Sequence, residues 1–275
     1  MSAIRTHVVT WAAVVVAIGC GGGKPQDASA TSKTEAPPLQ LAQAREDQAT
    51  AQPAGSAAVT GRVTFSGTPP AAERVKMDAD PQCALQHKDA VHKPEVVVNA
   101  NGTLKHVFVY VQQGLEGKVF AAPASAATLN QHGCMYEPHV FGVQVGQELS
   151  IVNSDPTLHN VNCKATKSKP FNLAQPVKGM KTSKQFAAAE IMIKCVCNVH
   201  PWMAAYIGVV AHPYFAVTGE EGTVSLAGLP AGTYTVSVAF TGLATSTASL
   251  EVTLNRVVTF DVVLQVGGVT ETIAV

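Results

Sequence analysis

The sequence contains few charged residues and no excess of either sign. Only 14% of its 275 residues are charged, and 19 basic residues balance 19 acidic ones. Soluble domains usually contain about 25% charged residues. A protein that binds nucleic acid needs a basic surface that displaces counterions from phosphates. The composition therefore argues against a nucleic-acid partner.

Long apolar runs are absent after the first twenty residues. No later segment reaches eighteen consecutive apolar residues, so we expect no membrane-spanning helix there. Three familiar catalytic patterns are also missing, namely a Ser/His/Asp motif, a phosphate-binding glycine loop and an HExxH motif. No site for a small-molecule substrate is evident.

The N-terminus has the pattern of an export signal. Arg5 precedes a largely apolar stretch at residues 8–18, which is shorter than the roughly 20 residues that span a bilayer. The tetrapeptide that ends at Cys20 resembles the lipobox of bacterial lipoproteins. This resemblance implies a signal peptide at residues 1–19 and a lipid on Cys20. The protein would then be exported and anchored to a bacterial membrane, facing the periplasm or the cell surface. The alternative is a cut elsewhere, with Cys20 left as a spare thiol.

A segment without aromatic residues follows, rich in Ala, Gln, Pro, Ser and Gly. Because it offers too little apolar area to offset the entropy of ordering, residues 20–57 are predicted to be the lipidated cysteine and a disordered tether.

Short strands bounded by turn residues dominate the rest of the chain, which predicts an all-β protein apart from a short helix. The expected strands lie at residues 59–65, 95–98, 106–112, 139–145, 148–153, 186–196, 206–211, 223–226, 232–240, 249–254 and 257–264. The last four are evenly spaced, as in a small β-sandwich. We therefore expect one domain at residues 58–212 and a second at 213–275.

Two short segments carry the ligands of a type 1 copper site. His159 follows one predicted strand, and Cys197, His200 and Met203 are spaced three residues apart after another. Two imidazoles and a thiolate with a weak thioether ligand are the donor set of such a site. A cysteine at a strand end, followed by a tight loop, can turn three side chains onto one ion. The sequence predicts a single copper ion held by these four residues.

The pattern Cys197-x-x-His200-Pro-x-Met203 matches the ligand loop of amicyanin-like and plastocyanin-like cupredoxins, and the segment from Asn153 to His159 resembles their upstream ligand segment. The longer run that follows looks like bacterial cupredoxins of the methylamine-utilisation type, which carry a carboxypeptidase-regulatory-like sandwich. The resemblance implies a Greek-key β-barrel or sandwich that binds copper.

Four further cysteines form an even set, as expected in an exported protein, and allow three disulfide pairings. The favoured pairing joins Cys83 to Cys134 and Cys163 to Cys195. Cys195 stands two residues before Cys197, so both point to one face of a strand. A binuclear copper centre that includes Cys195, or zinc bound by cysteines and histidines, remains an alternative.

The site favours one-electron transfer, because its ligands suit both Cu(I) and Cu(II). We see neither an open coordination position nor a nearby general acid or base, and so expect no enzymatic activity. The leading hypothesis is an electron carrier that passes electrons through an exposed edge of His200 to a redox protein docked there. Copper delivery without a redox role, or a surface scaffold with a structural metal, are the alternatives.

Overall fold

The structure is a computed structural model that describes residues 57–243, 245–265 and 272–274, all within one unit of the chain, Asp47–Val275. These residues form strands joined by loops, with one four-residue helix among them, α1 (Pro81–Ala84). The all-β prediction is confirmed. The predicted signal peptide, Cys20 and the tether up to residue 56 lie outside the described residues. Within the described part, no helix is long and apolar enough to cross a membrane.

Nine strands between residues 127 and 210 form what we call the first β-region. One sheet has five strands in the order β5 (Val140–Gln144), β11 (Ala204–Val210), β10 (Glu190–Val196), β7 (His159–Cys163) and β8 (Phe171–Gln175). The other sheet has four, in the order β4 (Met135–Glu137), β3 (Ala127–His132), β6 (Leu149–Asn153) and β9 (Lys181–Lys184). Buried side chains of both sheets, such as Ile151 and Ile207, form one apolar cluster. This arrangement is consistent with a cupredoxin-like sandwich.

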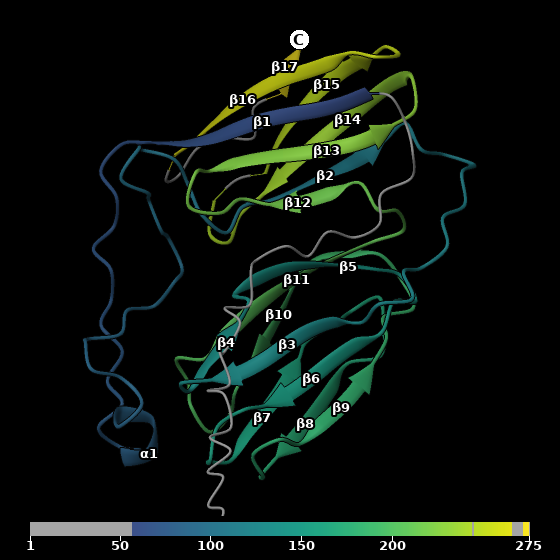
Figure 1. Cartoon of the computed structure of the whole chain (residues 1–275). Coiled ribbons are helices and arrows are strands. Elements are labelled where there is room, and N and C mark those ends of the chain that lie inside the picture. Colours follow the sequence, from purple (N-terminus) through teal and green to yellow (C-terminus); the bar gives the residue numbers. More distant parts are fainter. Residues whose placement is uncertain (1–56, 244, 266–271, 275) are drawn as a thin grey trace, which may run out of the picture. The chain divides into compact units, whose positions relative to one another are not determined.

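The remaining strands form the second β-region. Its three-stranded sheet has the order β13 (Thr223–Leu229), β1 (Ala57–Ser66) and β16 (Val257–Gln265). Its five-stranded sheet has the order β12 (Phe215–Val217), β2 (Phe108–Gln113), β14 (Gly232–Ala239), β15 (Ser246–Val252) and β17 (Thr272–Ala274). Figure 1 shows β1 lying between β13 and β16, antiparallel to the first and parallel to the second.

The expected boundary at residue 213 does not separate the hydrogen-bonded sheets. Strands β1 and β2 precede the whole first β-region in sequence, yet they pair with strands that follow it. The reason is that a strand with alternating apolar residues fits any sheet with one buried face, so the pattern does not specify which strands it pairs with. The chain therefore runs from the second β-region into the first and then back into the second.

Two glycines allow aromatic rings of β2 and β12 to pack against the first β-region. A Cβ atom at Gly142 on β5 would overlap the ring of Phe215, and one at Gly208 on β11 would overlap the ring of Phe108. Both rings belong to a buried cluster that also contains Tyr206 of β11. The glycines thus serve a close approach between sheets.

The strand predictions are confirmed best where burial alternates. The strand expected at residues 95–98 is wrong, because only an isolated bridge joins Val98 to Leu104. The strand expected at 186–196 begins at Glu190. Several short strands were not predicted, namely β3, β4, β7, β8, β9, β12 and β17. Sequences such as KTSK in β9 have no apolar alternation to indicate a strand.

Candidate metal centre

The loop between β10 and β11 places three of the predicted ligands. Cys197 follows the last residue of β10 directly, and Met203 precedes β11. The loop is closed by the Met203 amide, which donates to the His200 carbonyl at 2.9 Å, and by the Cys197 amide, which donates to the Met203 carbonyl at 3.2 Å. The His200 amide also donates to the Cys197 sulfur at 3.4 Å. All three side chains are buried.

His159 reaches the same point from the neighbouring strand. It is the first residue of β7, which pairs with the end of β10. Its Nδ1 lies 3.0 Å from Nδ1 of His200, and the Cys197 sulfur lies 3.8 Å from the latter atom. Ligand atoms of His159, Cys197 and His200 all lie within 4.8 Å of one another. The structure thus brings three predicted ligands together, and Met203 lies fully buried in the same apolar cluster as Cys197.

Asn160 supports the cysteine. Its side-chain oxygen accepts a hydrogen bond from the Asn198 amide at 2.6 Å and lies 3.4 Å from the Cys197 sulfur. Its own carbonyl accepts a hydrogen bond from the buried Tyr136 hydroxyl at 2.5 Å. These bonds tie the strand that bears His159 to the loop that bears Cys197.

A buried carboxylate, Asp155, orients His159. One of its oxygens lies 2.8 Å from Nε2 of His159. Its two oxygens also accept hydrogen bonds from the amides of Gly133 and Cys134, at 2.8 and 2.7 Å. Those two residues form the tight turn between β3 and β4, and both have positive φ, the conformation of a two-residue hairpin turn. The turn therefore fixes the position of the Asp155 carboxylate, which in turn fixes the ring of His159.

A second carboxylate, Asp80, contacts the other histidine. It lies just before α1, and its Oδ2 is 2.9 Å from Nε2 of His200. His200 is only 2% exposed. The expectation of an exposed His200 edge is therefore wrong, because the connection between β1 and β2 returns over the ligand loop and covers it.

The carboxylates shift the proton affinities of the site. Burial lowers the pKa of His159, but its hydrogen bonds to Asp155 and Cys197 outweigh this and raise the pKa to about 9. Burial raises the pKa of the Cys197 thiol, but hydrogen bonds from His159 and His200 outweigh it and lower the pKa to about 5. The pKa of His200 is raised in the same way, since its bonds to Cys197 and Asp80 outweigh burial. At neutral pH the metal-free site therefore holds a thiolate beside a protonated His159.

Two disulfides brace the site. Cys83 is joined to Cys134 and Cys163 to Cys195, which is the pairing that the sequence favours. The second links neighbouring residues of β7 and β10, the strands that bear or precede His159 and Cys197. Cys195 is therefore not free to bind metal, which removes the expected alternative of a centre that includes it. Among the described residues, Cys197 is the free cysteine.

The donor set fits copper. Two other groups of side chains in the described residues lie close enough to hold an ion, but both include a cysteine already bound in a disulfide. The group of His159, Cys197 and His200 offers two imidazole nitrogens and a thiolate. These are soft and intermediate donors, which select copper or zinc over magnesium or calcium.

Sequence reasoning missed Asp80 and Asp155. Both lie in segments that had been singled out, Asp80 three residues before Cys83 and Asp155 within the segment that leads to His159. Spacing in sequence does not show that either carboxylate meets an imidazole, because the contacts depend on how loops fold over the sheet ends. The only available signal was an acidic residue next to a proline at each place.

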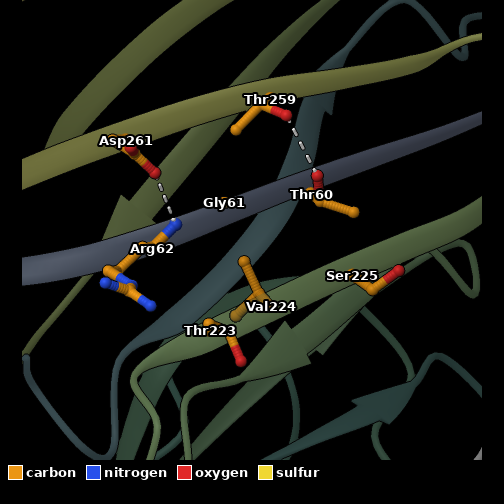
Figure 2. A pocket seen from close by; sticks show the side chains of 8 residues that line it. All are labelled: Thr60, Gly61, Arg62, Thr223, Val224, Ser225, Thr259 and Asp261. Carbon is orange, nitrogen blue, oxygen red and sulfur yellow. Dashed lines mark hydrogen bonds between the residues drawn. The ribbon is translucent and has the colours of Figure 1, made fainter.

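The second β-region has an open depression that is separate from this chemistry. It has a volume of about 460 Å³ and lies over the sheet of β13, β1 and β16. Figure 2 shows Thr60 beside Thr259 and the Arg62 backbone bonded to Asp261. No histidine or cysteine lines it, so it offers no comparable metal ligands.

No protein-family model and no curated protein matches the chain. Similar solved structures include a purple cupredoxin from Nitrosopumilus maritimus, with 21% identity, 30% of this chain and 98% of that chain covered, and a TM-score of 0.27. A methionine-to-alanine mutant of amicyanin in the Cu(I) form has 23% identity, coverages of 37% and 97%, and a TM-score of 0.28. A copper-containing nitrite reductase from Thermus scotoductus has 17% identity, coverages of 54% and 28%, and a TM-score of 0.29. These likenesses are too distant to assign a function.

The expectation that the protein is not an enzyme is wrong as an exclusion. One of the similar structures is a copper-containing nitrite reductase. The structure also places Asp80 and Asp155 against the histidines, whereas the exclusion assumed that no acid or base lies near the site.

Proposed function

We propose that the protein is a type 1 copper protein that passes single electrons to or from a redox protein. The observation that carries this proposal is the convergence of His159, Cys197 and His200, whose ligand atoms lie within 4.8 Å of one another in a buried position. Met203 belongs to the same loop and supplies the thioether expected of such a site.

Copper bound by these donors supplies a one-electron couple. The chain keeps the donors in place before metal arrives, because each imidazole is held at its Nε2 by a carboxylate and the Cys197 sulfur accepts a hydrogen bond from the His200 amide. Ligands that are already fixed rearrange little between oxidation states. This property favours electron transfer over exchange of the metal, and therefore favours a carrier over a delivery protein.

A redox partner would dock on apolar side chains around the site. Leu158 and Val199 directly precede the two histidine ligands and are 42% and 46% exposed. Leu85, which ends α1, is 80% exposed. The formal net charge of zero offers no long-range steering, so contact would depend on these apolar groups.

We further propose that the protein is exported and anchored to a bacterial membrane through a lipid on Cys20. The support is the lipobox-like sequence before Cys20. Disulfides persist in oxidising compartments, so two disulfides agree with export to the periplasm or cell surface.

Visible and EPR spectra of the copper-loaded protein test the proposal. We expect strong absorption at about 600 nm from thiolate-to-Cu(II) charge transfer, and we expect Cys197→Ser to lose it. A colourless protein that binds zinc in preference would contradict the copper carrier. A coloured protein that gives up its copper to a chelator within seconds would support delivery instead.

A further inference from the structure

A segment outside the first β-region reaches over the metal centre. Residues 73–93, which we call the strap, lie on the connection between β1 and β2 and include α1 (Figure 1). The ends of the strap are joined by the Lys93 amide, which donates to the Glu73 carbonyl at 2.9 Å, and by the Val75 amide, which donates to the Val91 carbonyl at 2.8 Å. The strap is therefore a closed loop of its own.

Two contacts fasten the strap to the turn that also holds Asp155. Cys83 in α1 is joined by a disulfide to Cys134 of that turn. His87 bonds through Nε2 to the carbonyl of Gly133 at 2.6 Å. Trp202 of the ligand loop donates from Nε1 to the Cys134 carbonyl at 3.0 Å. One turn thus fixes the strap and the ligand loop relative to each other.

Asp80 connects the strap to the ligand. Its Oδ1 caps α1 by accepting hydrogen bonds from the amides of Gln82 and Cys83, at 2.9 and 3.4 Å. Its Oδ2 accepts from Nε2 of His200 at 2.9 Å and from the Thr157 hydroxyl at 3.4 Å. With one oxygen the carboxylate orders the helix, and with the other it orders the imidazole.

The bond to Asp80 also decides which ring nitrogen of His200 is available. The Nε2–H group donates to the carboxylate, so Nδ1 keeps its lone pair and faces His159 and Cys197. A carboxylate behind a ligand histidine fixes the tautomer and makes the nitrogen a stronger donor. A stronger donor favours Cu(II) over Cu(I).

We propose that Asp80, which lies on the strap, is a positioning residue for the metal centre. It holds the ring of His200 in place and lowers the reduction potential of the bound copper. This inference rests on the proposed copper site. Asp80 differs from Asp155 in that its side chain is 22% exposed, so it can be replaced without leaving a fully buried cavity.

Asp80→Asn and Asp80→Ser test the proposal, since both residues still cap a helix but neither places a negative charge beside Nε2 of His200. Asp78→Asn is the matched control, because it removes the same charge from an exposed position on the strap. In the Asp80 variants we expect copper affinity to fall about 10- to 100-fold. We expect the ratio of Cu(II) to Cu(I) affinity to fall about tenfold, which raises the potential by about 59 mV.

The control should match the wild type in affinity and potential, and Asp80→Glu should recover part of both. Either Asp80 variant that folds, as judged by circular dichroism, gives a valid result. A copper affinity and a ratio of Cu(II) to Cu(I) affinity that both lie within twofold of the wild type in that variant would overturn the role of Asp80. The absorption at about 600 nm would still support the copper site. A wild type without this absorption would overturn both.

Discussion

The two β-regions bury different kinds of polar side chain. In the second region and the segments packed on it, the buried polar residues are four small hydroxyls, namely Thr103, Thr218, Ser237 and Ser246, and one imidazole, His212. The first buries amides, imidazoles and a carboxylate, including Gln131, Asn153, Asp155, His159, Gln175 and His200. Groups of this size and polarity are stable in a core only when each finds a partner.

The first region meets this need with a connected network. Gln131 donates to Gln175, Gln175 donates to the Ile151 carbonyl at 3.1 Å, and Asn153 donates to the Gln175 carbonyl at 2.8 Å. Both disulfides lie in or against this region, and the second contains no cysteine. The hydrogen-bond network and the disulfides are therefore concentrated in the region that contains the polar site.

The largest effect is expected from Asp155→Ala. Removal of one partner from a buried hydrogen-bonded pair costs about 3–5 kcal/mol. The substitution leaves His159 and the amides of Gly133 and Cys134 without their acceptor. Urea unfolding of the metal-free protein measures the loss. A loss below about 1 kcal/mol would show that the buried carboxylate is not what stabilises this region.

Removal of the disulfide between β7 and β10 should be nearly as damaging. In Cys163→Ala/Cys195→Ala, the cross-link spanning 32 residues is lost, which lowers the free energy of unfolding by about 3–4 kcal/mol in the chain-entropy account. Thermal unfolding monitored by circular dichroism measures it. Since Cys197 is untouched, the copper spectrum of the folded variant should persist, and its loss would mean that the disulfide also shapes the ligand set.

A pH dependence should be confined to the first region. Copper needs a neutral imidazole, and the pKa of His159 is raised to about 9. Copper affinity should therefore rise at least tenfold for each pH unit between about pH 6 and 8 and level off above pH 9. The pKa of Cys197 is lowered to about 5, so the thiol contributes no further proton in that window. Chelator competition across pH measures the slope, and a flat profile would contradict a protonated His159.

The stability of the metal-free protein follows from the same two groups. The folded pKa of His159 lies above its ordinary 6.5, so its contribution is full below pH 6.5 and is lost as pH rises through 9. The folded pKa of Cys197 lies below its ordinary 9.0, so its contribution is full above pH 9 and is lost as pH falls through 5. The two trends oppose each other between pH 6.5 and 9, and the raised pKa of His200 adds a further loss above pH 6.5. We therefore expect stability to be greatest near pH 6.5 and to decline both above it and towards pH 5, which urea unfolding across pH measures.

The smallest effect is expected from Ser237→Ala in the second region. The Ser237 hydroxyl is fully buried and has no hydrogen-bond partner. Because an unpaired buried hydroxyl is unfavourable, its removal should leave the free energy of unfolding unchanged or raise it by up to about 1 kcal/mol. Urea unfolding beside Asp155→Ala tests the contrast. A loss comparable to that of Asp155→Ala would show that the two regions do not differ as described.

The sequence predicts the second region better than the first. Strands β13, β15 and β16 alternate buried and exposed residues, and each strand from β13 to β16 lies near its predicted position. In the first region, β7 is almost entirely buried although its sequence, HNVNC, is polar at most positions. Its polar residues His159 and Asn160 are buried because they belong to the site, and hydrophobic periodicity does not predict burial of this kind.

The all-β class and the convergence of His159, Cys197 and His200 could be predicted from the residue pattern, because a strand end and a tight loop leave little freedom to the ligands they carry. The pairing of β1 and β2 with strands that follow the first β-region could not, since an alternating pattern fits many partners. The positions of Asp155 and Asp80 behind the two histidines, and the covering of His200 by the strap, also depend on the three-dimensional fold. Those contacts join residues as far apart as Asp80 and His200, and a carboxylate in a loop has no local preference that reveals its partner.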